Sequence, residues 1–471
     1  MEIKIFPAFF AAILYLLFFS GCSQLPGPFE TLADFEESFS KEKHAPLLPA
    51  EKLLTLERAI KTARLNNPSL LAAAQAVQAA KFTYYRSLSA YAPEIDLSSS
   101  PQHTLSRGWE LKNPPPGVMK RNNHFTAYGT IQATWLIFDG FARELETIIA
   151  KEELRKSKAA SENVLRLLER AVAYAYYDMY QAGEEMVIFA EDLAFQQSAL
   201  LQAQERFRNG HVSKASVLNF QILAARAKSQ ISNARYRRQT AFHALCALMG
   251  CSEKDLTENV ALEKISYKVM PVIHDDLFYL ELAISNRPDL VMEKIALTVA
   301  HRSRQKVYAD FMPEFRFFSE YTLDAYNADY GGYKVSNARS RQGIFTYGIE
   351  GKWNIFKGFD SYNNLQRYKA LEQIALWELN KKFLEIVAEV RDAASNCRNA
   401  RYQIQLYQDM EQWVKEQRDL VYSEYINGRE TITRLNEAQD TLIQAQNQLI
   451  VSAVEFNKAA AQLAAATGTG R

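Results

Sequence analysis

The sequence predicts a mainly α-helical protein with a small transmembrane β part, built from a duplicated unit of two strands and a hairpin of long helices. Three observations predict it: long stretches almost free of Gly and Pro, a seven-residue apolar repeat, and segments in which apolar and polar residues alternate. The 471 residues include only 18 Gly and 14 Pro. The 55 Lys and Arg balance 54 Asp and Glu, so composition gives no reason to expect a nucleic-acid partner.

The start of the chain has the pattern of an export signal. An almost wholly apolar run over residues 5–19 is too short for a comfortable membrane span and ends in small residues. Phe19-Ser-Gly-Cys22 resembles a bacterial lipobox. We therefore predict that residues 1–21 are a lipoprotein signal peptide, that Cys22 is acylated, and that residues 22–49 form an N-terminal anchor segment. An ordinary cleaved signal with an incidental cysteine is the alternative.

One unit of the chain occurs twice. Trp135-Leu-Ile-Phe-Asp-Gly-Phe141 returns 218 residues later as Trp353-Asn-Ile-Phe-Lys-Gly-Phe359. The order of landmarks predicts a first repeat at 50–250, a connecting (equatorial) segment at 251–287 and a second repeat at 288–468. The other paired landmarks are Asn67-Pro68 with Arg287-Pro288, Pro93 with Pro313, Asn209-Gly210 with Asn427-Gly428, and Gly250 with Gly468.

Each repeat is expected to contain one shorter and two long helices. The segments 68–92 and 288–312 begin with Pro, which is favoured at the first helical position, and end before the next Pro. The stretches 141–208 and 359–426 contain no Pro. A helix of that length would be roughly 100 Å long, far more than a globular core can cover.

The returning helix of each repeat carries a coiled-coil pattern, in which apolar positions alternate in steps of three and four. The Asn-Gly pairs before it suit a tight turn, which predicts hairpin tips at 209–213 and 427–431. The returning helix of the first repeat has the same stripe of apolar positions, interrupted only by Arg238. In the second copy the stripe is Leu435, Ala438, Leu442, Ala445, Leu449, Ser452, Phe456, Ala459, Leu463 and Ala466.

Four segments have a period of two. In 343–355 the odd positions are apolar or Gly and the even ones are mostly polar, and similar alternation ends at Ile137 in the first copy and follows both Pro-Glu pairs. An apolar face opposite a polar, partly charged face is typical of a transmembrane barrel strand. The segments 100–123 and 326–342 are expected to be polar loops on the outer face. A β-hairpin packed on the helices is the alternative.

Four strands cannot close a membrane barrel, because about eight are the minimum. An open sheet edge in lipid leaves backbone groups unsatisfied, at several kcal/mol each. Chains must therefore combine, and the residues alone permit two, three or four copies. Trp135 and Trp353, close to strand ends, are candidates for the membrane interface.

This doubled order of elements resembles the TolC-type outer-membrane efflux proteins over residues 50–468. The motifs are Trp-x-Ile-Phe-x-Gly-Phe, the tip segments Glu205–Ser213 and Glu424–Arg429, and Leu435-Asn-Glu-Ala-Gln439. The resemblance implies a homotrimer whose twelve strands form a β-barrel continuous with a periplasmic α-helical barrel. It also implies a lipid-anchored place in the outer membrane of a Gram-negative-type bacterium, in contact with outer-membrane lipid.

The function implied is the exit duct of a tripartite efflux or type I secretion system, a passive channel for small molecules or peptides. The implied partners are a periplasmic adaptor (membrane fusion) protein and an inner-membrane pump of RND, ABC or MFS type. The sequence contains no evident catalytic set, phosphate-binding loop or metal-ligand spacing, so neither enzyme activity nor a cofactor is expected. Cys246 and Cys251 are expected to be buried thiols, with a disulfide between them as the alternative. A lipid-anchored periplasmic coiled-coil scaffold without a pore is the alternative function.

Members of that family narrow the duct with acidic residues about two turns past the second tip glycine. Here those positions hold Arg434 and Glu437. This departure from the family pattern leads to the hypothesis that Arg–Glu pairing between subunits replaces the acidic ring at the closed end. Charges that only solvate a helix are the alternative. The candidates for adaptor contact, by position at the hairpin tips, are Gly210, Ser213, Ser216, Gly428, Thr431 and Thr433.

Overall fold

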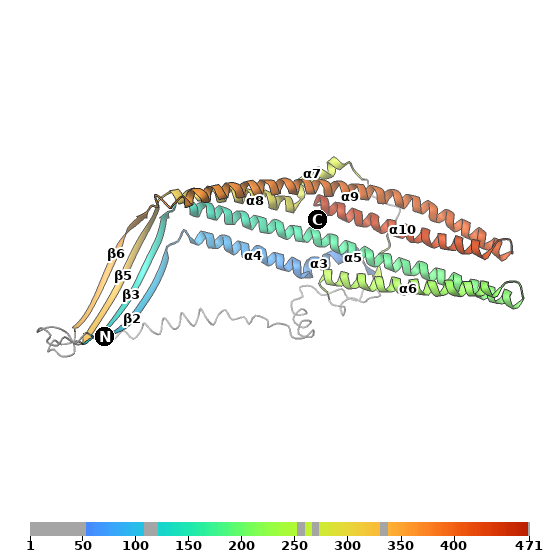
Figure 1. Ribbon diagram of the computed structural model, residues 1–471, viewed down its shortest axis with the longest axis horizontal. Helices are drawn as coiled ribbons and strands as arrows, with labels where there is room; N and C mark the ends of the chain where they lie inside the picture. The colour runs from blue at the N-terminus through green and yellow to red at the C-terminus, as the bar shows by residue number, and fades with distance from the viewer. Residues whose placement is uncertain (1–52, 108–120, 252–259, 266–272, 330–337, 470–471) are drawn as a thin grey trace.

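The computed structural model describes residues 53–107, 121–251, 260–265, 273–329 and 338–469. The molecule is elongated, with a four-stranded sheet at one end and the turns of two helical hairpins at the other (Figure 1). The predicted signal peptide, the anchor segment and Cys22 lie outside the described residues. Within the described ranges, no helix combines the length and the apolar character needed to cross a membrane.

Both copies of the unit have the same element order, which confirms the duplication. Helices α5 and α9 each have 67 residues, and α6 and α10 each have 36. Helix α7, the counterpart of α3, lies inside the segment expected to be a connection. The first copy contains α3 (Leu56–Asn66), α4 (Pro68–Ser89), β2 (Glu94–Arg107), β3 (Arg121–Phe138), α5 (Ala142–Arg208) and α6 (Lys214–Met249). The second contains α7 (Asp276–Asn286), α8 (Pro288–Lys306), β5 (Glu314–Asp329), β6 (Ala338–Lys352), α9 (Asp360–Ile426) and α10 (Ile432–Thr467).

The short helices α4 and α8 end earlier than expected. Helix α4 ends at Ser89 instead of 92, and α8 gives way to a short 3-10 helix, Val307–Phe311. A residue that precedes proline is disfavoured in the α region, and Met312 is accordingly extended, with ψ 155°. The chain must therefore leave the helix before each proline, and a turn separates helix from strand.

The long strands form one antiparallel sheet in the order β2-β3-β5-β6. They are 14 to 18 residues long and reach into the segments 100–123 and 326–342. The prediction of loops over the whole of these segments was therefore wrong. Ladder hydrogen bonds are made by the backbone, so polar residues can continue a strand, and the β2–β3 ladder extends to Arg107 and Arg121.

Strand β6 ends at Lys352, three residues before the end that the alternation predicted. Lys352 pairs with Glu314, the first residue of β5, so no strand of the described chain lies opposite residues 353–355. Strand β3 has neighbours on both sides and continues to Phe138, which a bulge brings opposite Phe315. The position of the neighbouring strand therefore decides where each strand ends.

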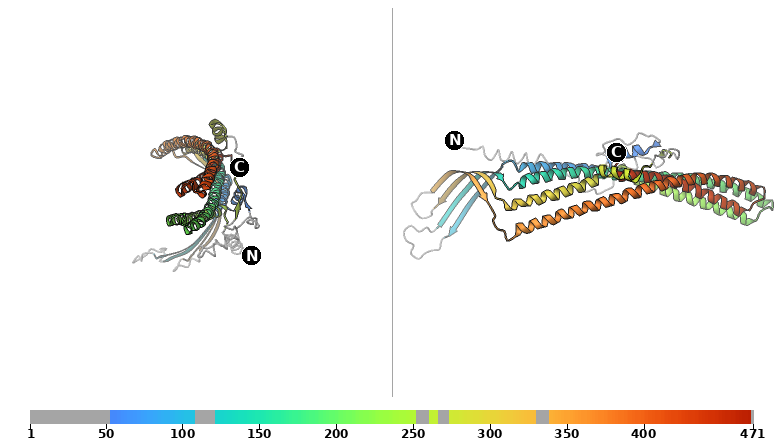
Figure 2. Two further views of the ribbon diagram at one scale, coloured as in Figure 1. Left: turned by 90° about the vertical axis from the view of Figure 1, so that its right-hand side faces the viewer. Right: turned by 90° about the horizontal axis from the view of Figure 1, so that it is seen from above.

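The hairpins α5–α6 and α9–α10 form the long part of the molecule, and α10 also packs along α5. The predicted stripe is buried in this packing: Leu435, Leu442 and Leu463 are buried and Leu449 is half-buried. This confirms the coiled-coil prediction. Seen end-on, the helices and the sheet follow an open arc (Figure 2, left).

A two-stranded parallel sheet, β1 (Leu53–Leu54) with β4 (Ala261–Leu262), lies against the middle of α5 and was not predicted. The hydroxyl of Tyr176 donates to the carbonyl oxygen of Leu54 at 3.1 Å, and burial raises the pKa of Tyr176 to about 12. Arg238, the break in the apolar stripe of α6, donates to the carbonyl oxygen of Val260 at 3.1 Å, just before β4. Arg238 therefore holds the connecting segment to the first hairpin.

Candidate functional site

One face of the sheet is apolar and exposed. The register places Leu97, Ile131, Tyr321 and Phe345 in a row across the four strands. Side chains on alternate residues of a strand point to opposite faces, so this row lies on one side of the sheet. All four side chains are exposed in the single chain. Exposed apolar surface of this extent marks contact with another apolar phase or with another protein surface.

The opposite face of the sheet is polar and acidic. Its central row is Asp96, Gln132, Glu320 and Thr346. Thr322, in the neighbouring row, donates to Glu320 at 2.7 Å. Basic side chains on this face are Arg316 and Lys352, and its carboxylates are Glu94, Asp96, Glu314, Glu320, Asp324 and Glu350.

The two predicted interface tryptophans occupy equivalent places at the junction of sheet and helices. The indole N–H of Trp135 donates to the carbonyl oxygen of Tyr91 at 3.0 Å, and that of Trp353 donates to the carbonyl oxygen of Phe311 at 3.1 Å. Both indole rings are exposed. Each tryptophan thus fastens the end of its second strand to the turn that precedes its first strand, and leaves its ring face accessible.

The strand-to-helix turns differ in what surrounds them. A Cβ added at Gly140 would lie 2.9 Å from Cα of Ala309 and from Cβ of Met312, both in the second repeat. At the equivalent Gly358, a Cβ would meet nothing within 4 Å among the described residues. One repeat therefore packs tightly on the next, whereas the corresponding surface of the second repeat is uncovered in the single chain.

A duplicated contact joins the helices half-way along the molecule, in a region called here the equatorial junction. The side-chain amide of Asn67 donates to the carbonyl oxygen of Leu248 at 2.8 Å, and in the second repeat Arg287 donates to that of Ala466 at 3.1 Å. Gly250, with φ +63°, lies so close to the neighbouring backbone that an added Cβ would clash with the carbonyl group of Asn66. Gly250 and its counterpart Gly468 therefore permit this close approach.

Arg287 is the centre of a buried charge cluster at this junction. It is 3% exposed, and it donates to Asp289 at 2.6 Å and to Glu389 at 2.8 Å. Arg166 lies 3.5 Å from the same Asp289 and donates to the carbonyl oxygen of Ala465 at 2.6 Å. Burial lowers the pKa of Arg166, with the nearby Arg287 charge acting in the same direction. The cluster links α5, α8, α9 and α10.

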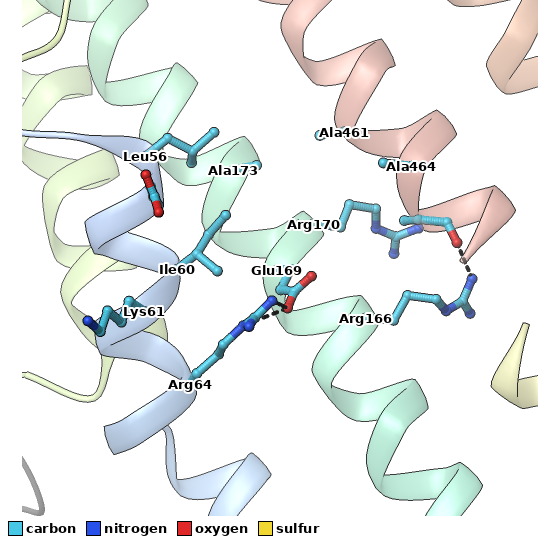
Figure 3. A pocket seen from close by; sticks show the side chains of 12 residues that line it. Leu56, Ile60, Lys61, Arg64, Arg166, Glu169, Arg170, Ala173, Ala461 and Ala464 are labelled. Atoms are coloured by element: carbon cyan, nitrogen blue, oxygen red, sulfur yellow. Dashed lines mark hydrogen bonds and ion pairs between the residues drawn. The ribbon is translucent and has the colours of Figure 1, made fainter. Parts of the chain in front are cut away.

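A cavity of about 650 Å³ opens beside this cluster, between α3, α5 and α10 (Figure 3). Its apolar wall includes Leu56, Ile60 and Ala464. Arg64 donates to Glu169 at 2.8 Å across the cavity, and burial raises the pKa of Glu169 against the lowering effect of Arg64. These polar side chains are engaged with one another, so we assign the cavity to the packing of the junction.

At the tips, the predicted adaptor residues lie in the two turns and the first turns of α6 and α10. Ser213 and Thr431 cap these helices: Ser213 accepts from the N–H of Ser216 at 3.4 Å, and Thr431 accepts from that of Arg434 at 3.3 Å. Ser216 is half-buried. The exposed members of the set are Gly210, Ser213, Gly428, Thr431 and Thr433.

The predicted gate residues are neighbours on one turn of α10. The guanidinium of Arg434 lies 3.5 Å from the carboxylate of Glu437, and their side chains are 49% and 61% exposed. A pair this exposed contributes little to the stability of the helix. Both groups are therefore available for contacts outside the chain.

Sequence reasoning missed Arg287, Asp289 and Glu389. One signal was present: Arg stands at the N-cap position before Pro288, where the first repeat has Asn, a favoured cap. Cys246 and Cys251 are buried, and the Cys251 sulfur lies 3.5 Å from the carbonyl oxygen of Cys246. Among the described residues, no three His, Cys, Asp or Glu side chains lie together as a metal site.

Comparisons with known proteins find the same architecture. The crystal structure of VceC from Vibrio cholerae is 17% identical, with a TM-score of 0.72 over 88% of this chain and 96% of VceC. The CmeC outer membrane channel of Campylobacter jejuni is 16% identical, with a TM-score of 0.76 over 91% and 89%. The open state of the MtrE outer membrane channel of Neisseria gonorrhoeae is 16% identical, with a TM-score of 0.70 over 88% and 88%. No curated protein sequence matches the chain.

The similarity to these structures shows that the chain has the fold of these outer membrane channels, with long helical hairpins continuous with a four-stranded sheet. A family profile described as "Outer membrane efflux protein" matches residues 59–251 and 279–469. The matched ranges include the sheet, both hairpins and the equatorial junction. The chain therefore belongs to the outer membrane efflux protein family.

Proposed function

We propose that three copies of this chain form the outer-membrane exit duct of a tripartite efflux or type I secretion system. The duct is a passive channel that exports small molecules or peptides. The observation that carries the proposal is the four-stranded sheet, which has an exposed apolar face, an acidic face and two edges without a partner strand among the described residues. Such a sheet is stable in lipid only when further copies close it, because unsatisfied backbone groups in a bilayer cost several kcal/mol each.

The internal repeat indicates how the copies join. Inside the chain, the second strand of the first repeat, β3, pairs with the first strand of the second repeat, β5. The same relation places β6 of one copy beside β2 of the next. Within the chain, Ala309 and Met312 in the turn after α8 cover Gly140. The same relation brings the turn after α4 of the next copy to the uncovered surface at Gly358. A head-to-tail relation of this kind gives a closed ring when its rotation closes, and closure is what removes the two open edges of the sheet.

The helices support the same arrangement. Helix α10 packs on α5 within the chain, so the repeat places α6 of one copy against α9 of its neighbour. The apolar residues that this seam would cover are exposed in the single chain. They are Ile222 and Tyr236 on α6 and Leu406, Trp413 and Leu420 on α9.

The orientation follows from the two ends of the molecule. The sheet lies in the outer membrane with Trp135 and Trp353 at the interface, and the hairpins extend into the periplasm. Acylated Cys22 anchors the chain to the membrane. The exposed tip residues Gly210 and Thr433, with the others in the two turns, receive a periplasmic adaptor, which connects the duct to an inner-membrane pump of RND, ABC or MFS type.

The gate is expected to involve Arg434. In the ring, the exposed Arg434 and Glu437 of one copy face those of its neighbours at the narrow end, where pairing between copies holds the tips together. Arg434→Ala removes the cation and leaves carboxylates that repel one another, so the conductance of single trimers in planar bilayers should rise. The helix cap at Thr431 uses only the backbone N–H of residue 434 and remains in the variant. Unchanged conductance would mean that these charges only solvate the helix.

The proposed function is tested on the full-length protein purified from outer membranes. A duct gives a trimer that dissociates on heating in detergent and conducts ions in planar bilayers. A lipid-anchored coiled-coil scaffold would give neither conductance nor a barrel-stabilised trimer. Deleting the gene should also sensitise cells to a compound that the associated pump exports.

A further inference from the structure

The seam between α5 and α10 contains buried polar side chains that the proposed duct does not explain. Asp192, Gln196 and Gln439 are 8%, 3% and 3% exposed. The side-chain amides of Gln196 and Gln439 both donate to Oδ1 of Asp192, at 3.1 and 2.9 Å. Asp192 and Gln196 belong to the first hairpin and Gln439 to the second. The cluster therefore ties together the two hairpins of one chain.

These contacts are a poor way to stabilise a helix seam. The amide oxygens of Gln196 and Gln439 are buried without a hydrogen-bond partner among the described residues. A buried carboxylate held by neutral amides, with unpaired oxygens beside it, is less favourable than well-packed apolar side chains of similar size. Polar residues in such seams are best attested as devices that fix the register of one helix on another.

The cluster lies where the apolar core of the hairpins is divided. On its equatorial side, Ile188 and Ile443 belong to one hydrophobic cluster. On its tip side, Ala199 and Leu435 belong to another. Within the second cluster the hairpins are also joined by the hydrogen bond of 3.1 Å from Gln202 to the hydroxyl of Tyr422. The tip part can therefore separate without disturbing the core on the equatorial side.

The seam between copies has no equivalent cluster. The repeat relation maps Asp192 to Met410, Gln196 to Val414, and Gln439 to Gln221. A thioether and a valine thus replace the carboxylate and one amide. Of the three polar groups only the amide of Gln221 remains, so the carboxylate that both amides share within the chain has no counterpart between chains.

We propose that Asp192, Gln196 and Gln439 form a register clamp at which the movement of the hairpin tips stops. The helices on the equatorial side of the clamp keep their register, and those on the tip side bend apart when the duct opens. The inference rests on the proposed function, because the movement is the opening of that duct.

Single-channel recording of purified full-length trimers tests the clamp. Gln439→Leu removes one hydrogen bond to the carboxylate, so the separation of the hairpins can extend past the clamp. This wider separation is available only to the open state, so the ratio of open to closed channels should rise, by up to about tenfold for the loss of a buried hydrogen bond to a charged group. Asp192→Asn keeps the size and an accepting oxygen but removes the charge, so it should raise the ratio less than Gln439→Leu does. Met410→Leu, at the equivalent place in the seam between copies, is the matched control and should gate like the wild type.

Hydrogen exchange provides a readout that general destabilisation would not produce. In the wild type, rapid exchange of α10 amides should end near Gln439. In the double variant Asp192→Leu, Gln439→Leu, which leaves no buried charge and keeps the seam packed, rapid exchange should extend past Ile443. Amides of the equatorial junction should be protected from exchange as strongly in this variant as in the wild type. If the exchange boundary in α10 does not move in the double variant, or if Gln439→Leu gates like the wild type, the clamp proposal is wrong.

The two proposals fail in different ways. A wild-type protein that forms no conducting trimer contradicts the duct, and the exchange boundary still decides whether the clamp exists. A wild-type channel that conducts, with variants that gate and exchange like it, contradicts the clamp alone.

Discussion

Replacing Arg287 by alanine is expected to lower the unfolding free energy by about 3–5 kcal/mol, because it removes one partner of a buried ion pair and leaves the other charge unpaired. Arg287 is 3% exposed and holds Asp289, Glu389 and the carbonyl oxygen of Ala466 at 2.6 to 3.1 Å. Without the guanidinium, two partly buried carboxylates face each other with no shared cation between them. The denaturant midpoint of the purified protein, followed by circular dichroism, measures the loss.

The control for this substitution is Arg155→Ala. Arg155 lies 2.9 Å from Glu152 on the same helix, and its side chain is 62% exposed. A pair on one helix whose cation is this exposed contributes about 0.2–1 kcal/mol, so the variant should unfold almost like the wild type. Equal losses in the two variants would show that the Arg287 cluster has no special role.

The Arg287 cluster should also make stability depend on pH. Burial raises the pKa of Asp289, but hydrogen bonds and charge from Arg287 outweigh burial and hold the pKa below its usual value. The group therefore stabilises the fold above its unfolded pKa of about 3.9, and this contribution disappears as the pH falls through the folded value. The deficit of Arg287→Ala should consequently be largest near neutral pH and shrink below about pH 4. A deficit independent of pH would contradict this explanation.

The assembled duct is expected to conduct cations in preference to anions. The polar face of the sheet carries Asp96 and Glu320 in its central row, and its carboxylates outnumber its basic side chains six to two. Charges of one sign in a narrow water-filled passage with low-dielectric walls concentrate counter-ions. The reversal potential of trimers in a bilayer across a KCl gradient measures the preference. It should weaken at high salt, because the screening length falls to about 3 Å at 1 M.

The double variant Asp96→Asn, Glu320→Gln should lower the cation preference without changing the fold, since both replacements keep the size of the side chain. Arg341→Gln is the matched control. Arg341 pairs with Ala325 on the apolar face of the same sheet, so its charge lies outside the passage. A reversal potential that responds equally to both changes, or that favours chloride in the wild type, would contradict an acidic lumen.

Local rules predicted the helical part closely. Long helices follow from stretches without proline. The starts of α4 and α10 coincide with the caps Asn67, which accepts from two backbone N–H groups, and Thr431. The seven-residue period correctly predicted which side of α10 is buried, and Leu435 on that side is fully buried. These features depend on residues within one or two turns of each other, which a sequence displays directly.

The strands and the candidate sites were predicted less well. The alternation marked the middle of each strand, but the ends depended on the neighbouring strand, as Lys352 opposite Glu314 illustrates. The proximity of Asp192 to Gln439 arises only when two hairpins pack, with 247 residues between them. The periodicity of a single helix cannot predict such a contact.

The order of residues is enough to predict a duplicated strand-and-hairpin unit with a coiled-coil stripe, and a sheet with one apolar and one polar face. Those properties depend on short-range backbone preferences and on the spacing of apolar residues. The tertiary structure alone decided where the strands end, which seams are polar and that Arg287 is buried among carboxylates. Each of these depends on which distant segments come into contact, and burial changes the energy of a charge only once they do.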